Sequence, residues 1–411
     1  MKPINFRFTL LCTFLLVIVS CNKVHDELHD FLHPKQEPSK KVYVDNVNRL
    51  YEVVNDAANA GSIIVLAPGT YPLSPNHPNG GRIELLKDMS LVGQQGHPEL
   101  VVIDVSALPL SSVLIPSGLG PTIRTGAIRT GNGTNAIEWM TLQSNGTKED
   151  IRSLIQTDIV ATQVTKLRVA HTIEQGAGIG INLANRDVTS NGRTIEAEIE
   201  DNTVRNNSLL SNGIGIFIQS QGSNDGTIKA VLKGNYIYGN QQGIIVAHSI
   251  CSNHQISVES HNDRIEENGA GVVLRSLSTR ANTPTENNVI RFAAFSTDIR
   301  NNRGVPTPVS VPISGGMQIA AGVLDGPATP GTVNNNRVEA LFDACRLEGN
   351  TGATQITAYG ALSTAAGTPP VGSNNTAVIY LKGLSKNTTV NAINSVPPEP
   401  AGTNKVVVDR Q

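Results

Sequence analysis

Apolar and polar residues alternate over short spans along much of the chain, which is typical of β-strands rather than helices. In the stretch from Asp201 to Ser220, DNTVRNNSLLSNGIGIFIQS, these spans are interrupted by Asn and Gly. Both residue types adopt left-handed backbone conformations readily, so they favour tight turns between strands. The pattern therefore predicts short strands that place aliphatic side chains in a narrow interior, joined by turns rich in Asn and Gly.

One such pattern recurs five times from residue 195 onward. Each copy opens on an aliphatic residue, has a smaller or apolar residue two positions later, an aliphatic residue nine later and Asn twelve later. The copies are IEAEIEDNTVRNN (195–207), IKAVLKGNYIYGN (228–240), ISVESHNDRIEEN (256–268), IRFAAFSTDIRNN (290–302) and VEALFDACRLEGN (338–350). The intervals of 33, 28, 34 and 48 residues indicate insertions in loops. Because the Asn recurs at one site, successive copies predict a ladder of side-chain hydrogen bonds.

These repeats resemble the coils of the right-handed parallel β-helix, the pectin-lyase-like fold. The stretches LYEVVNDAANAGSIIVLAPGTYPL (50–73) and KDMSLVGQQGHPELVVID (87–104) are similar to the opening of that fold, where a short capping helix leads into the first coils. The resemblance implies an all-β solenoid of about ten to twelve coils over residues 42–395. Residues 47–60 are the expected N-terminal capping helix, and residues 396–411 a C-terminal cap or tail.

The first 41 residues predict export and anchoring. Lys2 and Arg7 precede an apolar run, Phe8 to Val19, which is too short to cross a membrane as a helix. The sequence VIVSC, which ends at Cys21, resembles the bacterial lipobox, and this resemblance implies a lipidated Cys21 after removal of a signal peptide (1–20). Residues 21–41 then form a flexible tether. The expected location is extracytoplasmic, anchored by lipid to a bacterial membrane and in particular the outer membrane; the alternative is a plain secretory signal.

Composition narrows the range of partners. The net charge is −2 and no dense basic cluster occurs, so a nucleic-acid partner is not expected. Aromatic residues make up only 4% of the chain, and Trp139 is the one tryptophan that sugars could stack on. Cys251 and Cys345 remain in the exported part, where the favoured interpretation is two separate buried thiols rather than a disulfide.

Stacking of the copies predicts three columns of outward-facing side chains on the first strand of each coil. The columns are Glu196, Lys229, Ser257, Arg291 and Glu339; Glu198, Val231, Glu259, Ala293 and Leu341; and Glu200, Lys233, His261, Phe295 and Asp343. The candidate surface groove, here named the charged group, comprises Glu198, Glu200, Lys233, Glu259 and His261. A simpler interpretation is that opposite charges on neighbouring strands, such as Glu196 with Lys229, stabilise the sheet by up to about 1 kcal/mol per pair.

Two classes of function follow. The first is a scaffold that binds a glycan or a surface protein. The second is a lyase or hydrolase acting on an acidic polysaccharide, since lyases of the resembled family pair carboxylate-bound calcium with an Arg or Lys base. Calcium is expected only under this second alternative, and no other cofactor or metal site is predicted. The paired Asp motifs of the family's hydrolases and the Asp clusters of its pectate lyases are missing, which favours the scaffold.

A second sheet predicts an apolar surface. Phe217, Ile245 and Val273 point away from their inward-facing neighbours, so both faces of this sheet are apolar. One alternative is that the insert 303–336 covers them. The other is that these three residues form an exposed stripe, and such a stripe marks an interaction surface.

Overall fold

The computed structural model describes residues 40–108, 113–117, 120–124, 126–145, 153–157, 163–186, 190–207, 213–278, 284–304, 315–324, 332–351, 355–363, 372–383, 388–396 and 403–411. Cys21, the predicted signal peptide and nearly all of the predicted tether lie outside these residues. Residues 41–411 form one compact unit. Within the described residues, no helix has both the length and the apolar character needed to span a membrane.

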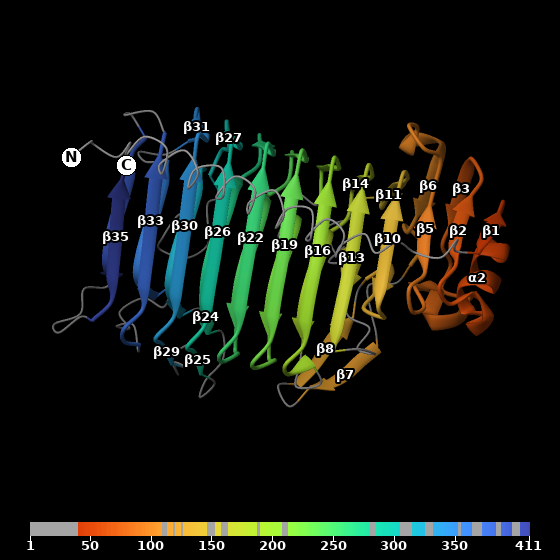
Figure 1. Ribbon diagram of the computed structural model, residues 1–411, viewed down its shortest axis with the longest axis horizontal. Coiled ribbons are helices and arrows are strands. Elements are labelled where there is room, and N and C mark those ends of the chain that lie inside the picture. The colour runs from red at the N-terminus through yellow and green to blue at the C-terminus, as the bar shows by residue number, and fades with distance from the viewer. Residues whose placement is uncertain are drawn as a thin grey trace, which may run out of the picture. The chain divides into compact units, whose positions relative to one another are not determined.

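Three parallel sheets build this unit (Figure 1). Sheet A contains β1 (Lys41–Val44), β2 (Ile63–Leu66), β5 (Ser90–Val92), β10 (Thr134–Glu138), β13 (Val164–Ala170), β16 (Thr194–Glu200), β19 (Thr227–Lys233), β22 (Gln255–His261), β26 (Val289–Phe295), β30 (Arg337–Asp343), β33 (Thr376–Lys382) and β35 (Lys405–Arg410). Sheet B contains β3 (Gly69–Pro72), β6 (Val101–Asp104), β11 (Thr141–Gln143), β14 (Ile173–Gln175), β17 (Thr203–Arg205), β20 (Tyr236–Tyr238), β23 (Arg264–Glu266), β27 (Asp298–Arg300) and β31 (Arg346–Glu348). Sheet C contains β4 (Ile83–Glu84), β9 (Ile128–Thr130), β12 (Ser153–Thr157), β15 (Ile179–Arg186), β18 (Ile214–Gln221), β21 (Gln242–Ser249), β24 (Ala270–Ser278), β28 (Met317–Leu324), β32 (Ile356–Ser363) and β34 (Val390–Val396).

The chain visits sheets A, B and C in turn, and each strand pairs with its counterpart one coil further on. This is the right-handed parallel β-helix that the sequence predicted, and the twelve strands of sheet A agree with the predicted coil number. The C-terminal boundary differs from the expectation. Strand β35 lies within the predicted cap or tail, 396–411, yet it pairs with β33 and so continues the sheet beyond residue 395.

Few elements lie outside the three sheets. Helix α2 (Val47–Asn55) begins after Asn46, whose side chain accepts a hydrogen bond from the Arg49 amide at 2.9 Å. Its buried face packs against β1 and β4, so the predicted N-terminal capping helix is confirmed. The remaining elements are the 3-10 helices η1 (Ala57–Asn59), η2 (Pro78–Gly81) and η3 (Pro98–Leu100), the pair β25 (Thr285–Glu286) and β29 (Val333–Asn334), and the hairpin β7 (Val113–Ser117) with β8 (Gly120–Arg124).

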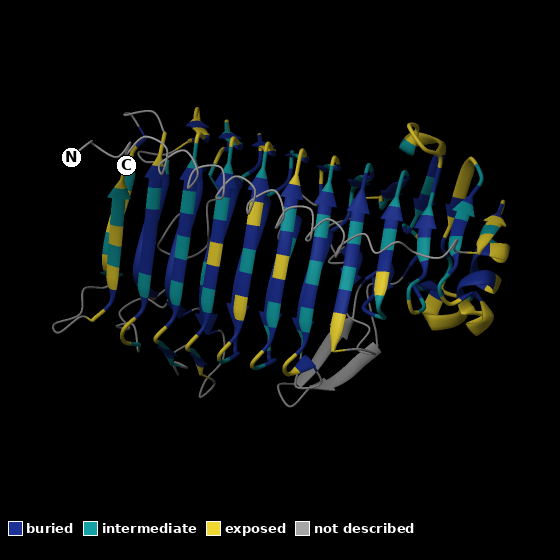
Figure 2. Cartoon of the chain, viewed as in Figure 1, coloured by how far each residue is buried: buried dark blue, intermediate teal, exposed yellow. Residues whose placement is uncertain are grey.

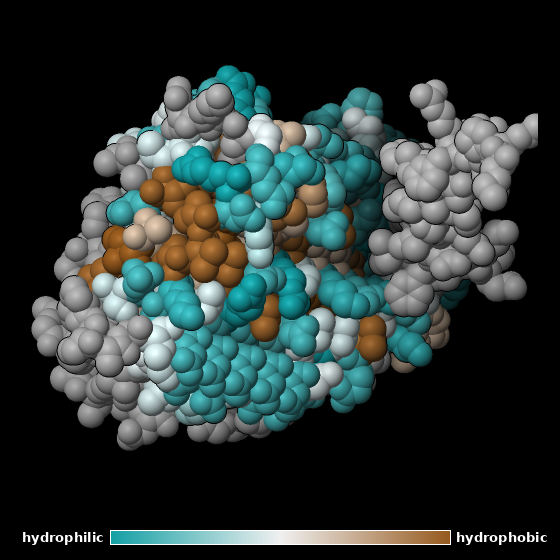
Figure 3. All heavy atoms as spheres, turned by 60° about the vertical axis from the view of Figure 1, so that its left-hand side comes forward, coloured by the Kyte–Doolittle hydropathy of each residue, from teal (hydrophilic) through white to brown (hydrophobic). Residues whose placement is uncertain are grey.

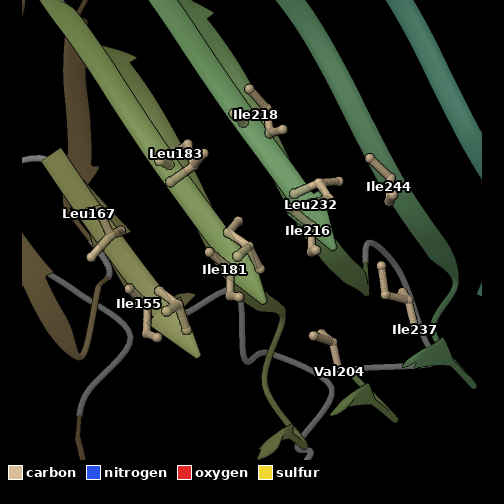
Figure 4. Close-up of a cluster of buried hydrophobic side chains, with 14 of the residues drawn as sticks. Ile155, Leu167, Ile181, Leu183, Val204, Ile216, Ile218, Leu232, Ile237 and Ile244 are labelled. Carbon is tan, nitrogen blue, oxygen red and sulfur yellow. The ribbon is translucent and has the colours of Figure 1, made fainter. Parts of the chain in front are cut away.

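Alternation along the strands of sheet A defines the interior. In β16 the side chains of Ile195, Ala197 and Ile199 are buried, whereas the residues between them are partly exposed. Figure 2 shows this alternation along the neighbouring strands. Aliphatic side chains from all three sheets meet in one continuous core, part of which is drawn in Figure 4. The predicted inward-facing set is confirmed.

The last strands leave part of this core open. Val390, Val406 and Val408 are only partly buried against the core, and Val407 lies between the last two on the outer face of β35, where it is 45% exposed. In Figure 3 this end of the β-helix comes forward, and hydrophobic residues gather on the face in view.

Left-handed residues mark the bends between sheets, as the Asn and Gly content predicted. At the bend from sheet A to sheet B, successive coils place Trp139, His171, Asp201, Gly234, Asn262, Ser296, Ala344 and Gly383, all with φ between 50° and 67°. At the bend from sheet B to sheet C, the Asn that closes each repeat is buried. The side chains of Asn207, Asn240, Asn268, Asn302 and Asn350 form a ladder with Nδ2 to Oδ1 distances of 2.9–3.2 Å.

A glycine column accompanies this ladder. Gly215, Gly243 and Gly271 are each the second residue of a sheet C strand, in β18, β21 and β24. A Cβ atom on Gly243 would lie 2.6 Å from the carbonyl oxygen of Gly271 and 2.8 Å from the Ile265 side chain. Adjacent coils therefore approach too closely here for any side chain.

Candidate functional site

The charged group lies on the outer face of sheet A, in the predicted register. Glu200 pairs with Lys233, which pairs with His261 one coil further on, and Glu198 and Glu259 lie in the neighbouring column. Strands β16, β19 and β22 thus bring all five predicted residues to one surface. The order of the columns is as predicted because the repeats stack without a register shift.

Close contacts within the charged group are ion pairs. Lys233 Nζ lies 2.7 Å from Glu200 Oε1. Beside the charged group, Lys229 Nζ lies 3.5 Å from Glu196 Oε1, so the predicted pair of Glu196 with Lys229 is confirmed. Partial burial alone would raise the pKa of Glu200, but hydrogen bonds from Lys233 and Arg168 bring it below its ordinary value. The hydrogen bond to Glu200 in turn raises the pKa of Lys233. Both groups stay charged at neutral pH, so Lys233 is not a neutral base.

Arg168 on β13 is the residue that sequence reasoning missed here. Its guanidinium contacts the carboxylates of Glu138 and, at 3.5 and 3.0 Å, Glu198 and Glu200. The coil that carries Arg168 escaped the repeat search because Thr165 and Glu174 occupy its two key aliphatic positions. With Arg168 included, the acidic side of the charged group is neutralised by cations on both flanks.

Glu259 and His261 complete the charged group. His261 Nε2 lies 3.2 Å from Glu259 Oε2, and the imidazole stacks on Phe295 with ring centroids 4.9 Å apart. Among the described residues, no group of three or more His, Cys, Asp or Glu side chains is placed to hold a metal ion.

A second cluster lies on the outer face of sheet B and was not predicted. We name Arg205, Tyr236, Tyr238, Arg264, Glu266 and Arg300 the tyrosine–arginine cluster; they come from β17, β20, β23 and β27. The rings of Tyr236 and Tyr238 stack with centroids 4.2 Å apart, and the Arg264 guanidinium lies 4.7 Å from the Tyr236 centroid. Both tyrosines are partly exposed.

Glu266 holds the centre of this cluster. Its carboxylate contacts Arg264 and accepts hydrogen bonds from Arg300 Nε at 2.8 Å and from Tyr236 Oη at 2.8 Å. Burial alone would raise the pKa of Glu266, but these donors hold it below its ordinary value. Burial, followed by the hydrogen bond to Glu266, raises the pKa of Tyr236 to about 12. Glu266 is thus ionised and Tyr236 is neutral, which fixes both side chains.

The tyrosine–arginine cluster has the chemistry of a binding surface. Tyrosine offers a flat apolar face with a polar edge, and arginine offers several donors in a rigid plane. The repeat contains a sequence signal for this cluster. In each copy, the aliphatic residue nine positions after the start points inward, so its two neighbours, such as Tyr236 and Tyr238 beside Ile237, point outward. This signal lies on the second strand of each copy, whereas the predicted columns lie on the first.

Trp139, the predicted sugar platform, has its ring in an internal contact. The indole stacks on His171 with centroids 3.9 Å apart, and His171 Nδ1 lies 3.7 Å from Asp201 Oδ2. The backbone of Trp139 has a φ of 59°, which is uncommon for a bulky side chain.

The predicted apolar stripe is largely covered. Ile245 is 1% exposed, Val273 is fully buried, and Phe217 is partly buried beside a second hydrophobic cluster on sheet C. For Ile245 and Val273 the structure therefore agrees with a covered face, not with an exposed interaction surface. Residues 305–314 and 325–331 of the insert proposed as the cover lie outside the described residues.

Cys251 and Cys345 are both free and buried, as favoured from the sequence. Burial raises the pKa of the Cys251 thiol to about 12 and that of the Cys345 thiol to about 11. Neither is a reactive thiolate at neutral pH.

Comparisons with known proteins bear on the fold alone. No protein-family model matches the chain, and no curated protein matches it. Similar solved structures include the mannuronan C-5 epimerase A-module of Azotobacter vinelandii, at 12% identity over 89% of this chain and 95% of that one, with a TM-score of 0.35. An endo-xylogalacturonan hydrolase from Aspergillus tubingensis is 12% identical over 89% of each chain, with a TM-score of 0.39. The Dettilon tailspike protein is 12% identical over 86% of this chain and 68% of that one, with a TM-score of 0.42.

Proposed function

We propose that this protein is an extracytoplasmic scaffold, anchored to a bacterial membrane by a lipid on Cys21, that binds a glycan without cleaving it. The observation that carries the proposal is the tyrosine–arginine cluster on sheet B. There, a partly exposed pair of stacked rings lies beside fixed donors and acceptors. Sugar rings present both an apolar face and a rim of hydroxyl groups, and this cluster complements both.

The β-helix suits such a role because its outer faces are long, regular and rigid. Side chains one coil apart are separated by about 4.8 Å, the spacing of paired strands, so neighbouring residues along a column can contact one extended chain. The ion pairs of the charged group support a binding role over catalysis. Glu198 and Glu200 are held by Arg168, and Glu200 is also held by Lys233.

Tyr238→Ala is expected to weaken glycan binding about tenfold, because it removes one ring of the stacked pair. The measurement is titration calorimetry of the purified protein against acidic and neutral polysaccharides, with and without calcium. Tyr43→Ala is the matched control, since Tyr43 is a tyrosine of sheet A that is 73% exposed and lies outside the cluster. The control variant is expected to bind as the wild type does.

The same samples distinguish binding from catalysis. Unsaturated or new reducing ends that appear in the wild type and vanish in Lys233→Ala would contradict the scaffold and identify an enzyme whose site is the charged group. Binding that leaves the polymer unchanged supports the proposal. If Tyr238→Ala and the wild type bind the glycan with equal affinity, the tyrosine–arginine cluster is not the binding site.

The anchor is tested separately. Cys21→Ser is expected to move the protein from the membrane fraction to the soluble fraction, because the lipid would have no attachment site. Fractionation followed by mass spectrometry of the N-terminal peptide measures both location and acylation. An unmodified N-terminus in membrane-bound wild-type protein would contradict the lipid anchor and favour the plain secretory signal.

A further inference from the structure

Arg205 differs from the other arginines of the tyrosine–arginine cluster. Its Nε donates to Gln175 Oε1 at 3.0 Å and its Nη1 donates to Tyr238 Oη at 2.9 Å. Both acceptors are neutral, and within the described part of the chain no carboxylate forms an ion pair with Arg205. By contrast, Arg264 and Arg300 share the carboxylate of Glu266.

Two neutral acceptors fix the guanidinium without neutralising it. A guanidinium has five N–H donors, and two of those of Arg205 are used by Gln175 and Tyr238. The others have no partner among the described residues. Arg205 is partly buried, so its charge is screened less than that of a side chain in open solvent.

The charges of the surrounding face add to this effect. Arg205, Arg264 and Arg300 face two carboxylates, those of Glu266 and Asp298, so three positive and two negative charges leave a net charge of +1. The excess cation lies on Arg205, because the other two arginines contact the acids. Tyr238 accepts from Arg205, which leaves its own hydroxyl proton free to donate in the same direction.

We propose that Arg205, with the Tyr238 hydroxyl, recognises an anionic substituent, a carboxylate or a sulfate ester, on the glycan that binds to the tyrosine–arginine cluster. This inference rests on the proposed function and adds its ligand class. A planar guanidinium with parallel free donors binds oxyanions in a forked geometry, and such charge-assisted hydrogen bonds are stronger than neutral ones. Neutral glycans gain the stacking contact and neutral hydrogen bonds, without this charge assistance.

The test uses three polymers with one backbone: dextran, carboxymethyl dextran and dextran sulfate. Wild-type protein is expected to bind at least one of the charged polymers about tenfold or more tightly than dextran, and Arg205→Gln is expected to abolish that preference. Arg346→Gln is the matched control, because Arg346 lies on the same face but is paired with Glu348. It is expected to keep the preference. Arg205→Lys retains the charge without the fork, so a reduced preference is expected.

The two charged polymers distinguish the source of the oxyanion. Loss of preference for carboxymethyl dextran alone assigns a carboxylate, and loss for dextran sulfate alone assigns a sulfate ester. An Arg205→Gln variant that keeps the full preference would overturn the role of Arg205, while sensitivity of all three polymers to Tyr238→Ala would leave the proposed function standing. Equal weakening of all three polymers by Arg205→Gln would also overturn selective recognition. If the wild type binds none of the acidic or neutral polysaccharides, the proposed function fails and this inference fails with it.

Discussion

Glu174→Leu is expected to raise the free energy of unfolding at pH 9 by up to about 5 kcal/mol. Glu174 is completely buried in the core of sheet B, in the column that holds Leu142 before it and Val204 after it. Desolvation raises its pKa from the ordinary 4.5 to about 8, despite a hydrogen bond with Thr172. Leucine already occupies this position one coil earlier, so the substitution fits the repeat.

The sign of the pH dependence follows from the raised pKa. The folded state holds the Glu174 proton up to about pH 8, whereas the unfolded chain releases it near pH 4.5. The stability associated with this proton is therefore complete below about pH 4.5 and is lost progressively as the pH rises to about 8. Burial also raises the pKa of Asp263 to about 6, so Asp263 contributes in the same direction, but only at lower pH. The loss between about pH 6 and pH 8 belongs to Glu174.

Urea unfolding at pH 4, 6 and 9 measures this loss. Wild-type protein is expected to lose stability between pH 6 and pH 9, and Glu174→Gln, which cannot ionise, is expected to show a flatter profile there. Below pH 6 the buried His248 and His254, whose pKa values are lowered by burial, add stability as the pH rises and oppose the loss from Glu174 and Asp263. Glu348→Gln is the control, because Glu348 lies on an exposed part of sheet B and is paired with Arg346. Identical profiles for Glu174→Gln and the wild type above pH 6 would contradict a buried, protonated Glu174.

A continuous hydrogen-bond chain gives this glutamic acid a structural role. Thr172 Oγ1 contacts the Glu174 carboxyl and donates to Asn202 Oδ1 at 2.7 Å. Asn202 Nδ2 donates to Asn235 at 3.0 Å, and Asn235 Nδ2 donates to Asp263 at 2.8 Å. Asp263 accepts at the far end of this chain, where Ser260 Oγ also donates to it at 2.6 Å. The chain runs along the corner between sheets A and B and joins Glu174 to the neighbouring coils.

The sequence predicted those features that repeat with a fixed period. The Asn ladder and the charge columns of sheet A both follow from one register, so five aligned copies were sufficient. Features that break the repeat were not predicted. Glu174 and Thr165 stand where aliphatic residues were required, which hid the coil that carries Arg168. Contacts such as that of Arg205 with Tyr238 depend on side-chain conformation across two strands, and spacing alone does not determine it.

Asn268→Ala is expected to lower the free energy of unfolding by about 4 kcal/mol. Asn268 is fully buried in the middle of the ladder. Its Nδ2 donates to Asn302 Oδ1 at 3.2 Å and to the Ile237 carbonyl at 3.0 Å. Its Oδ1 accepts from the backbone N and the side-chain Nδ2 of Asn240, at 3.0 and 3.1 Å. Alanine removes all four bonds. Asn240 Nδ2 keeps its bond to the Val204 carbonyl, and Asn302 Oδ1 keeps that from the residue 268 backbone N, whereas the Asn240 backbone N loses its acceptor. A buried group left unsatisfied costs about 1–3 kcal/mol.

Urea denaturation at neutral pH, followed by far-UV circular dichroism, measures this loss. Asn391→Ala is the control, because Asn391 is an exposed Asn on the last strand of sheet C, and a change within about 0.5 kcal/mol is expected there.

A double-mutant cycle with Asn240→Ala adds a sharper test. The two side chains share hydrogen bonds, so the double variant is expected to lose less stability than the two single variants together. Additive losses, or a loss for Asn268→Ala no larger than that of the control, would contradict a cooperative ladder. Such a result would leave the aliphatic core as the main force that holds neighbouring coils together.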